Sequence, residues 1–348
     1  MRDKTRHCRT VVVGNEAADL DSVVSSLCYA YLHSIRSGTA AVALINCTRS
    51  DFVLRTEILY LLSLSGISPD DLLFIDTVNL PALLQNAELI LVDHNQPGVD
   101  WISYSSRISA IIDHHKDAGL FRNVSPRIIR TVGSTATLIA EEFMRHSVHI
   151  DRDVASLLLA AIILDTQNLS PQLKKATAAD GDAVTALLAL APLDREALFL
   201  ELQRRRFTVD GMSGSELLRR DYKEYQSGDT RYGIAVIYKD LAGLLTRDRN
   251  FFTAVEHCRK ERELELLAVM LVFMDSGFRR ELLVSWENGS GQDRFCELLQ
   301  ENGFALSPLS LESVTAGIPS GIRVYHQGEE SCSRKVLAPV LAAFFSRQ

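Results

Sequence analysis

The 348-residue sequence has few cysteines and no long apolar run. Its six cysteines are scattered without a Cys-x-x-Cys pair, which argues against a zinc knuckle or a disulfide framework and fits a reducing compartment. The longest apolar stretch, residues 154–164, is far shorter than the roughly 20 residues that a membrane-spanning helix needs. Residues 1–10 contain no apolar core of the kind that a signal peptide carries. We therefore expect a cytoplasmic protein that does not insert into a membrane.

Basic residues are also in the minority. The chain has 37 Lys and Arg against 44 Asp and Glu, so its net charge is −7. This balance argues against a protein whose main partner is nucleic acid or a membrane surface. With 47% hydrophobic and 23% charged residues the chain is an ordinary folded protein, and its length at about 150 residues per domain predicts two domains.

The first half of the chain alternates short apolar runs with segments of helical period. The apolar runs predict strands at residues 10–14, 41–45, 72–76, 89–93 and 108–113. Helical periodicity predicts helices at residues 22–34, 54–64, 80–86, 134–146, 153–164 and 178–190. This alternation predicts an α/β fold, with a mostly parallel sheet covered by helices on both faces.

After residue 192 the pattern changes. A charged helix is predicted at 193–206, and a Gly/Ser stretch follows it. Further on, the pattern predicts helices at 217–225, 251–263 and 333–346, with strands at 232–238, 266–274 and 281–286. We predict a first domain at 1–192, a hinge at 193–210 and a smaller second domain of helices and strands at 211–348.

Acidic residues and histidines follow the apolar segments that should be buried. They are Asp19 and Asp21 after the first strand, Asp93-His94-Asn95, Asp113-His114-His115, and Asp165 at the end of an apolar helix. The carboxyl ends of parallel strands meet at one edge of a sheet, where several carboxylates repel each other unless cations lie between them. Oxygen-rich clusters with one or two imidazoles suit Mg²⁺ or Mn²⁺, and two such ions can hold a phosphoryl group and activate water.

Each of these residues has a simpler explanation when it is taken singly. Asp19 fits a helix N-cap, Asp21 a first-turn acid, and Asp93 or Asp113 a turn residue. Asp165 fits the cap of the segment that follows it. Their joint occurrence after buried segments favours a metal site.

These motifs resemble the DHH phosphoesterase superfamily, which is named for the Asp-His-His found here at 113–115. Residues 14–22, 93–95 and 133–137 resemble other motifs of the superfamily, and Asp165 stands where its fourth motif is expected. The resemblance is closest to the DHHA2 branch, which holds eukaryotic exopolyphosphatases, prune-type proteins and family II inorganic pyrophosphatases. The DHHA1 branch carries a Gly-Gly motif, and no two glycines are adjacent here.

The resemblance implies two divalent cations. It implies that the metal ligands are Asp19, Asp21, Asp93, His114 and Asp165. Asp93 and Asp19 would hold one ion, and Asp93 would bridge to a second ion held by the other three. His115 would contact the substrate and serve as an acid.

One position departs from the pyrophosphatase pattern, which has histidine where this chain has Asn15. An amide oxygen in place of an imidazole makes the first metal site harder, which favours Mg²⁺, with Mn²⁺ or Co²⁺ as substitutes. Exopolyphosphatases of this type share the asparagine. Alternatively, Asn15 only caps the turn after the first strand.

The resemblance also implies phosphate-binding residues in the second domain. Lys223 lies in a segment like the one that supplies a substrate-binding lysine, and Arg334 and Lys335 lie in a terminal Ser-Arg-Lys. Taken alone, all three would be solvated charges at helical positions. Residues 204–206 are three arginines that either attract a polyanion or form a solvated helix end.

The expected function is that of a metal-dependent exopolyphosphatase. A metal-bridging hydroxide would attack the terminal phosphorus of inorganic polyphosphate and release orthophosphate, while Lys223, Arg334 and Lys335 neutralise charge. The alternatives are a pyrophosphatase or short-chain polyphosphatase of the prune type, and a prune-like protein that only binds partners.

Overall fold

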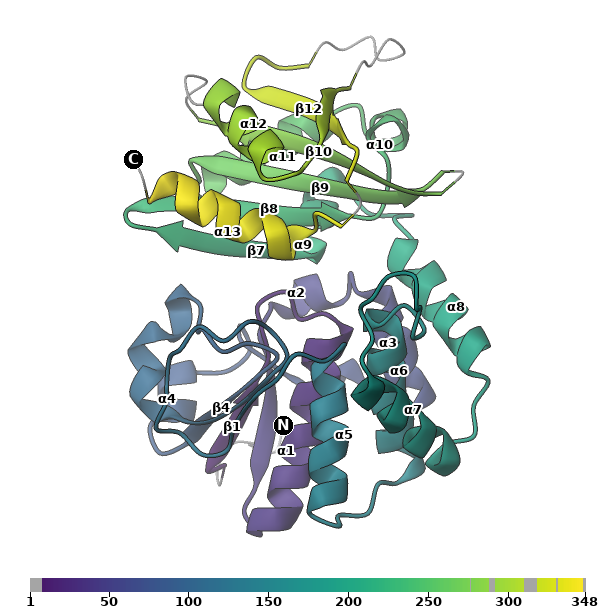
Figure 1. Ribbon diagram of the computed structural model, residues 1–348. Coiled ribbons are helices and arrows are strands. Elements are labelled where there is room, and N and C mark those ends of the chain that lie inside the picture. Colours follow the sequence, from purple (N-terminus) through teal and green to yellow (C-terminus); the bar gives the residue numbers. More distant parts are fainter. Residues whose placement is uncertain (1–7, 276, 288–291, 310–317, 330, 347–348) are drawn as a thin grey trace. The chain divides into compact units, whose positions relative to one another are not determined.

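The computed structural model describes residues 8–275, 277–287, 292–309, 318–329 and 331–346 (Figure 1). The chain forms two compact units, Met1–Arg206 and Phe207–Gln348. The division falls inside the segment predicted as a hinge, but most of that segment is helix α8 (Arg195–Phe207). Leu198, Phe199 and Leu202 of α8 are buried in the core of unit 1. The end of unit 1 is therefore a packed helix.

Unit 1 is built on a six-stranded sheet in which every pairing is parallel. Its strands are β1 (Thr10–Val13), β2 (Ala41–Ile45), β3 (Leu73–Phe74), β4 (Glu88–Val92), β5 (Ile108–Asp113) and β6 (Arg127–Ile129). Their order is β3-β2-β1-β4-β5-β6, so the direction in which strands are added reverses between β1 and β4. Ligands bind beyond the carboxyl ends of the strands at such a switch point.

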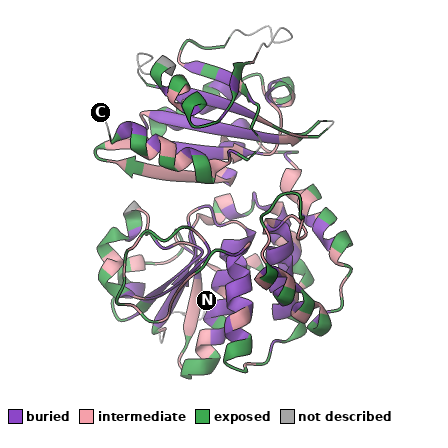
Figure 2. Cartoon of the chain, viewed as in Figure 1, coloured by how far each residue is buried: buried purple, intermediate pink, exposed green. Residues whose placement is uncertain are grey.

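Helices cover both faces of this sheet, as its continuous apolar strands require. One face packs on α1 (Leu20–Ser37), α3 (Thr56–Leu64), α5 (Thr135–Arg145), α6 (Arg152–Asp165), α7 (Ala178–Leu190) and α8. The other face packs on α4 (Leu80–Leu84) and the 3₁₀ helix η2 (Val99–Arg107). Alternate β1 residues serve the two cores: Val12 faces the first and Val11 the second. The central strands β1, β4 and β5 are largely buried (Figure 2). The predicted α/β fold is confirmed.

Three short elements of unit 1 differ from the sequence prediction. The strand predicted at 72–76 is only Leu73–Phe74. The helix predicted at 54–64 begins at Thr56, and a separate turn of helix, α2 (Arg49–Phe52), precedes it. Strand β6 was not predicted, because its three residues are only partly buried and lie at the edge of the sheet. A short edge strand carries little periodic signal.

Unit 2 holds a second six-stranded sheet, of mixed direction. Its strands are β7 (Tyr222–Ser227), β8 (Thr230–Ile237), β9 (Leu266–Met274), β10 (Phe278–Trp286), β11 (Leu306–Pro308) and β12 (Ile322–Gln327), in the order β11-β12-β10-β9-β8-β7. Helices α9 (Gly214–Arg220), α10 (Leu241–Arg247) and α11 (Phe251–Glu261) pack on one face. Helices α12 (Gln292–Glu301) and α13 (Arg334–Phe345) pack on the other. β8 and β9 pair in parallel, and the other pairings are antiparallel.

The helix predicted at 217–225 is wrong in its second half. Helix α9 ends at Arg220, and β7 begins two residues later. β7 pairs antiparallel with β8 across a hairpin whose Gly228 has a φ of 58°, the left-handed region that glycine adopts readily. Lys223 therefore lies on an edge strand. Helices α10 and α12 and strands β11 and β12 were not predicted.

Two further expectations concern the chemistry of the chain as a whole. All six cysteines are free thiols, so no disulfide holds either unit. No helix within the described ranges combines the length and the apolar character needed to cross a bilayer.

Candidate metal centre

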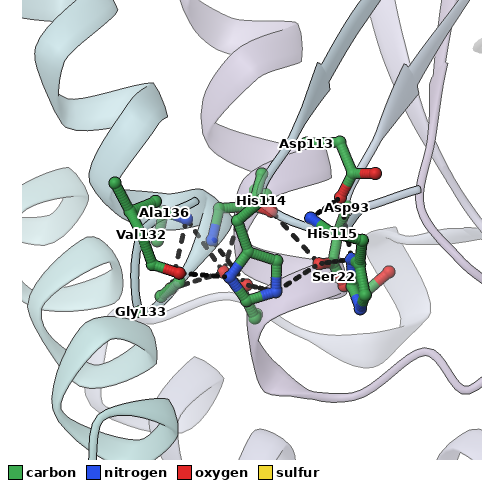
Figure 3. A network of polar contacts seen from close by, with 12 residues as sticks. Ser22, Asp93, Asp113, His114, His115, Val132, Gly133 and Ala136 are labelled. Carbon is green, nitrogen blue, oxygen red and sulfur yellow. Dashed lines mark hydrogen bonds and ion pairs between the residues drawn. The ribbon is translucent and has the colours of Figure 1, made fainter. Parts of the chain in front are cut away.

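The candidate residues of unit 1 gather beyond the carboxyl ends of its central strands (Figure 3). Asn15 follows β1, Asp93 follows β4, and Asp113 is the last residue of β5. All three side chains are buried. Gly14 brings α1 close behind β1, because a Cβ at this position would lie 2.1 Å from Ser22 Oγ. The switch point of the sheet thus holds buried polar groups in place of apolar ones.

Asp21 binds the N-terminal end of α5. Its Oδ1 accepts hydrogen bonds from Ser134 Oγ (2.7 Å) and the backbone N–H of Ala136 (2.9 Å), and its Oδ2 accepts from the N–H of Thr135 (2.7 Å). Ser134 is also the N-cap of α5. The N–H groups at the start of a helix have no partner within the helix and favour an acidic side chain, so these three hydrogen bonds hold the Asp21 carboxylate in one orientation.

Asp93 has a backbone φ of 60°, which few residues other than glycine adopt. Its Oδ2 lies 2.5 Å from Asn15 Nδ2, and its Oδ1 accepts from Thr135 Oγ1 at 3.1 Å. Aspartate tolerates this conformation better than most residues, and such strained positions cluster at functional sites. The backbone turn after β4 therefore directs this carboxylate toward the groups around it.

His114 lies between the two buried acids. Its Nδ1 donates a proton to the carbonyl oxygen of Val132 at 3.1 Å, because a carbonyl can only accept. Its Nε2 lies 3.5 Å from Asp93 Oδ1 and 4.0 Å from Asp21 Oδ2. When Nδ1 carries the proton of a neutral ring, Nε2 has a lone pair and lies close to two carboxylates. A cation bound by Nε2 and these carboxylates would stabilise this arrangement. A histidine whose other N–H is fixed by a backbone carbonyl is a usual metal ligand. The donor set fits a divalent metal ion.

His115 is held by Asp113 in turn. Asp113 Oδ1 accepts from the backbone N–H of His115 (3.1 Å) and from its Nδ1 (2.8 Å), and Asp113 Oδ2 accepts from Asn95 Nδ2. Burial would raise the pKa of Asp113, but the hydrogen bonds from His115 and Asn95 outweigh it and hold that pKa well below its usual range. The ionised carboxylate fixes the tautomer and the orientation of the His115 ring.

Two groups of potential ligand atoms result, each with its atoms within 4.8 Å of one another. One contains Asp93, His114 and His115, and the other contains Asp21, His114 and Asp165. Four of the five predicted metal ligands thus lie together, joined by His115, which was predicted to contact substrate. Asp19 is in neither group, and its side chain caps α1 by accepting from the N–H of Ser22 at 3.1 Å.

Asn15 was predicted either to belong to the metal site or to cap the turn after the first strand, and its contacts have features of both. Its Oδ1 accepts from the N–H of Ala17 at 2.9 Å, as in a local turn cap, while its Nδ2 donates to Asp93. The amide oxygen that was expected to face an ion thus faces the backbone. Asn15 acts on the site by holding Asp93.

Sequence reasoning assigned no role to Ser134, Thr135 or Asn95. The structure shows that they bind the three buried acids Asp21, Asp93 and Asp113. A signal was present for each: the first two begin a helix after the Asp-His-His motif, and Asn95 ends the Asp-His-Asn motif. Small hydroxyl and amide side chains at such positions are suited to hold carboxylates.

The predicted phosphate-binding residues all belong to unit 2. Lys223 is partly buried on β7, and Arg334 is the first residue of α13, after the N-cap Ser333. Lys335 follows it and is exposed. Arg334 Nη1 forms an ion pair with Asp221 Oδ1 at 2.6 Å.

The arginines at 204–206 lie on α8 in unit 1. Arg204 and Arg205 both form ion pairs with Glu201, and the Arg205 guanidinium lies 4.1 Å from the centre of the Tyr60 ring. These contacts favour the interpretation as a solvated helix end.

Comparison with known proteins shows the family to which the chain belongs. Residues 9–162 match the DHH family, N-terminal domain, and residues 200–344 match the DHHA2 domain. The chain is 32% identical to a candidate exopolyphosphatase of Schizosaccharomyces pombe, over 95% of this chain and 89% of that protein. The chain belongs to the DHH family, in the branch with a DHHA2 domain. This confirms the resemblance found in the sequence.

Other relatives match most of the chain. Exopolyphosphatase PRUNE1 of Homo sapiens is 31% identical over 98% of this chain and 78% of its own length. Manganese-dependent inorganic pyrophosphatase of Methanothrix thermoacetophila is 27% identical over 75% of this chain and 80% of its own length. The crystal structure of a candidate family II inorganic pyrophosphatase from Methanococcus jannaschii superposes with a TM-score of 0.68, at 22% identity and over 96% of this chain and 99% of the other. It shares the fold.

Proposed function

We propose that this protein is a metal-dependent exopolyphosphatase that releases orthophosphate from the end of inorganic polyphosphate. The observation that carries the proposal is the pair of buried carboxylates, Asp21 and Asp93, on either side of the Nε2 atom of His114. Burying ionised carboxylates is costly without compensating charge. The relatives named exopolyphosphatase, at about 31% identity over nearly the whole chain, support the same activity.

The residues that would hold divalent cations are Asp21, Asp93, His114 and Asp165, with His115 adjacent. Bound divalent cations supply a water of lowered pKa and neutralise charge on the phosphoryl oxygens. Relatives named manganese-dependent pyrophosphatases support dependence on a divalent metal. Two ions and a preference for Mg²⁺ over Mn²⁺ remain part of the proposal, as does a place for Asp19 among the ligands.

The chain's own residues would then have separate roles in the reaction. Asp113 keeps a proton on Nδ1 of His115, so that the other ring nitrogen exchanges a proton with a substrate phosphate. Thr135 and Asn15 hold Asp93, and the start of α5 holds Asp21, so the acids do not reorganise during reaction. Lys223, Arg334 and Lys335 would bind the phosphate chain, since cationic groups offset charge in phosphoryl transfer.

Hydrolysis of pyrophosphate or other short phosphates is the second candidate. The pyrophosphatase relatives and the shared fold favour it. A protein that only binds partners has no use for buried, hydrogen-bonded acids at the switch point, so the structure favours an enzyme.

The direct test is phosphate release from pyrophosphate, tripolyphosphate and long polyphosphate, each with Mg²⁺, Mn²⁺ and Co²⁺. An exopolyphosphatase releases phosphate from long chains with at least one of these ions. Activity on pyrophosphate alone would favour the second candidate, and no release from any substrate would reject both.

A matched pair of variants on α6 ties the activity to the site. Asp165→Asn removes a candidate ligand at the end of this helix, while Asp153→Asn removes an exposed acid in its first turn. We expect loss of phosphate release in the first variant and none in the second. Equal activities in the two variants would remove Asp165 from the site.

A further inference from the structure

An acidic residue in unit 2 binds one of the proposed phosphate-binding cations. Arg334 Nη1 lies 2.6 Å from Asp221 Oδ1 and 3.3 Å from the backbone oxygen of the same residue. Both side chains are largely buried, with 16% of Arg334 and 13% of Asp221 exposed. Asp221 lies between α9 and β7, so this ion pair joins residues that are 113 positions apart in the sequence.

The carboxylate of Asp221 is itself held from another element. Its Oδ2 accepts from Tyr238 Oη at 3.3 Å, just after β8. The Tyr238 ring packs edge-on against Phe207, with 5.1 Å between ring centres. The backbone oxygen of Asp221 also accepts from the N–H of Val236 at 2.9 Å. Asp221 is thus held by contacts with Tyr238 and Val236 in addition to its contact with Arg334.

Simple electrostatics argues against an acid at this position. A carboxylate beside a cation that binds a polyanion repels the polyanion and weakens the cation's attraction. An arginine side chain, however, loses rotamer entropy when a ligand orders it, and a partner that orders it beforehand removes part of that cost. The guanidinium has five N–H donors, more than its contacts with Asp221 use.

We propose that Asp221 is a positioning residue that sets the guanidinium of Arg334 for phosphate, with Tyr238 holding the carboxylate. The inference deepens the proposed function, because it rests on Arg334 binding substrate. Asp221 acts through Arg334 and does not touch the reacting atoms.

The experiment uses the full chain and long polyphosphate as the probe, and it measures KM and kcat separately. Asp221→Asn should raise KM about five- to tenfold and leave kcat within about twofold, because binding of the phosphate chain is weakened. Tyr238→Phe should change KM in the same direction by less. Asp229→Asn, the same substitution at an exposed site in the β7–β8 hairpin, should leave both constants unchanged.

A second background separates positioning from other roles. In Arg334→Ala, adding Asp221→Asn should have no further effect on KM, since the group that it positions is gone. If Asp221→Asn lowers KM, repulsion of the polyanion is its main effect and the inference is wrong. If its effect persists in full in Arg334→Ala, with a lowered melting temperature in both backgrounds, Asp221 acts on the fold of unit 2 independently of Arg334 and the inference is wrong.

Failure of the inference can be told from failure of the proposed function. A wild-type chain that releases no phosphate from polyphosphate with Mg²⁺, Mn²⁺ or Co²⁺ overturns the function. An active wild-type chain whose KM is unchanged by Asp221→Asn overturns the positioning role alone.

Discussion

The two groups of candidate functional residues differ in how firmly the protein holds them. In unit 1, Asp21 is 1% exposed and accepts from Ser134, Thr135 and Ala136. In unit 2, Lys335 is exposed on the first turn of α13 and Lys223 is partly buried. The acid is fixed by the fold, whereas Lys335 faces solvent.

The physical reason lies in the cost of burying charge. A carboxylate at a parallel sheet's switch point is surrounded by protein, so its oxygens require donors or a cation. An exposed lysine keeps its hydration and orders only when a polyanion arrives. Removing a buried acid should therefore abolish activity, and removing a surface cation should only weaken binding.

The largest effect is expected for Asp93→Asn. We expect a loss of roughly 10³-fold or more in kcat/KM, because the carboxylate shared by the site's imidazoles and amides loses its charge. Stability without metal should be unchanged or raised, since asparagine also tolerates a φ of 60° and repulsion from Asp21 is relieved. Phosphate release and thermal melting in chelator measure the two effects. Activity near that of the wild type would reject the metal centre.

A smaller loss is expected for Asp113→Asn, which changes a residue that orients His115. Proton transfer typically contributes 10²–10⁴-fold, so a misoriented ring should lower kcat by about 10²-fold. Asn95→Ala, which removes a donor to the other Asp113 oxygen, should lower kcat by less. Unchanged kcat in both variants would show that His115 needs no orienting acid.

The effect of Asp113→Asn on the stability of the protein should also depend on pH. The pKa of Asp113 is lowered in the folded protein, so its contribution to stability is fully present above its unfolded pKa of about 4 and is lost as the pH falls through the folded value. The difference in melting temperature between wild type and variant should therefore be constant near neutral pH and shrink below about pH 4.

Asn15→His addresses metal preference and should have a moderate effect. An imidazole that reaches the ion should raise affinity for Mn²⁺ or Co²⁺ more than for Mg²⁺ and favour pyrophosphate over long chains. Because Asn15 donates to Asp93 and accepts from Ala17, the alternative is a lowered melting temperature with unchanged metal preference. Phosphate release titrated with Mg²⁺ and Mn²⁺ separates the two outcomes.

The smallest effect is expected for Arg204→Ala, outside both groups. Arg204 is mostly exposed and forms its ion pair with Glu201, one turn away on α8. Such surface pairs contribute little. We expect the KM for long polyphosphate to stay within about twofold of the wild type. A KM raised as much as in Arg334→Ala would assign these arginines to the binding of the polyanion.

Much of the site could be predicted because its local signals are strong. The apolar runs before Asn15, Asp93 and Asp113 form strands β1, β4 and β5, since continuous β-branched residues suit a sheet that is buried on both faces. Where the sequence signals are weaker, the prediction was wrong. Residues 221–225 carry two tyrosines and three charges, which fit a helix face as well as an edge strand, and only pairing with β8 decides between them.

The sequence by itself determined which chemical groups follow the buried strands, because hydrophobic runs and the residues that end them are local properties of the chain. Only the tertiary structure decided which of these groups meet. The reversal of strand order between β1 and β4 places Asn15 against Asp93, which is 78 positions away, and turns its amide nitrogen to that carboxylate. The same packing places the start of α5 on Asp21 and brings Asp165 close to His114. Contacts between distant segments depend on how the elements pack, and periodicity along the chain carries no information about that.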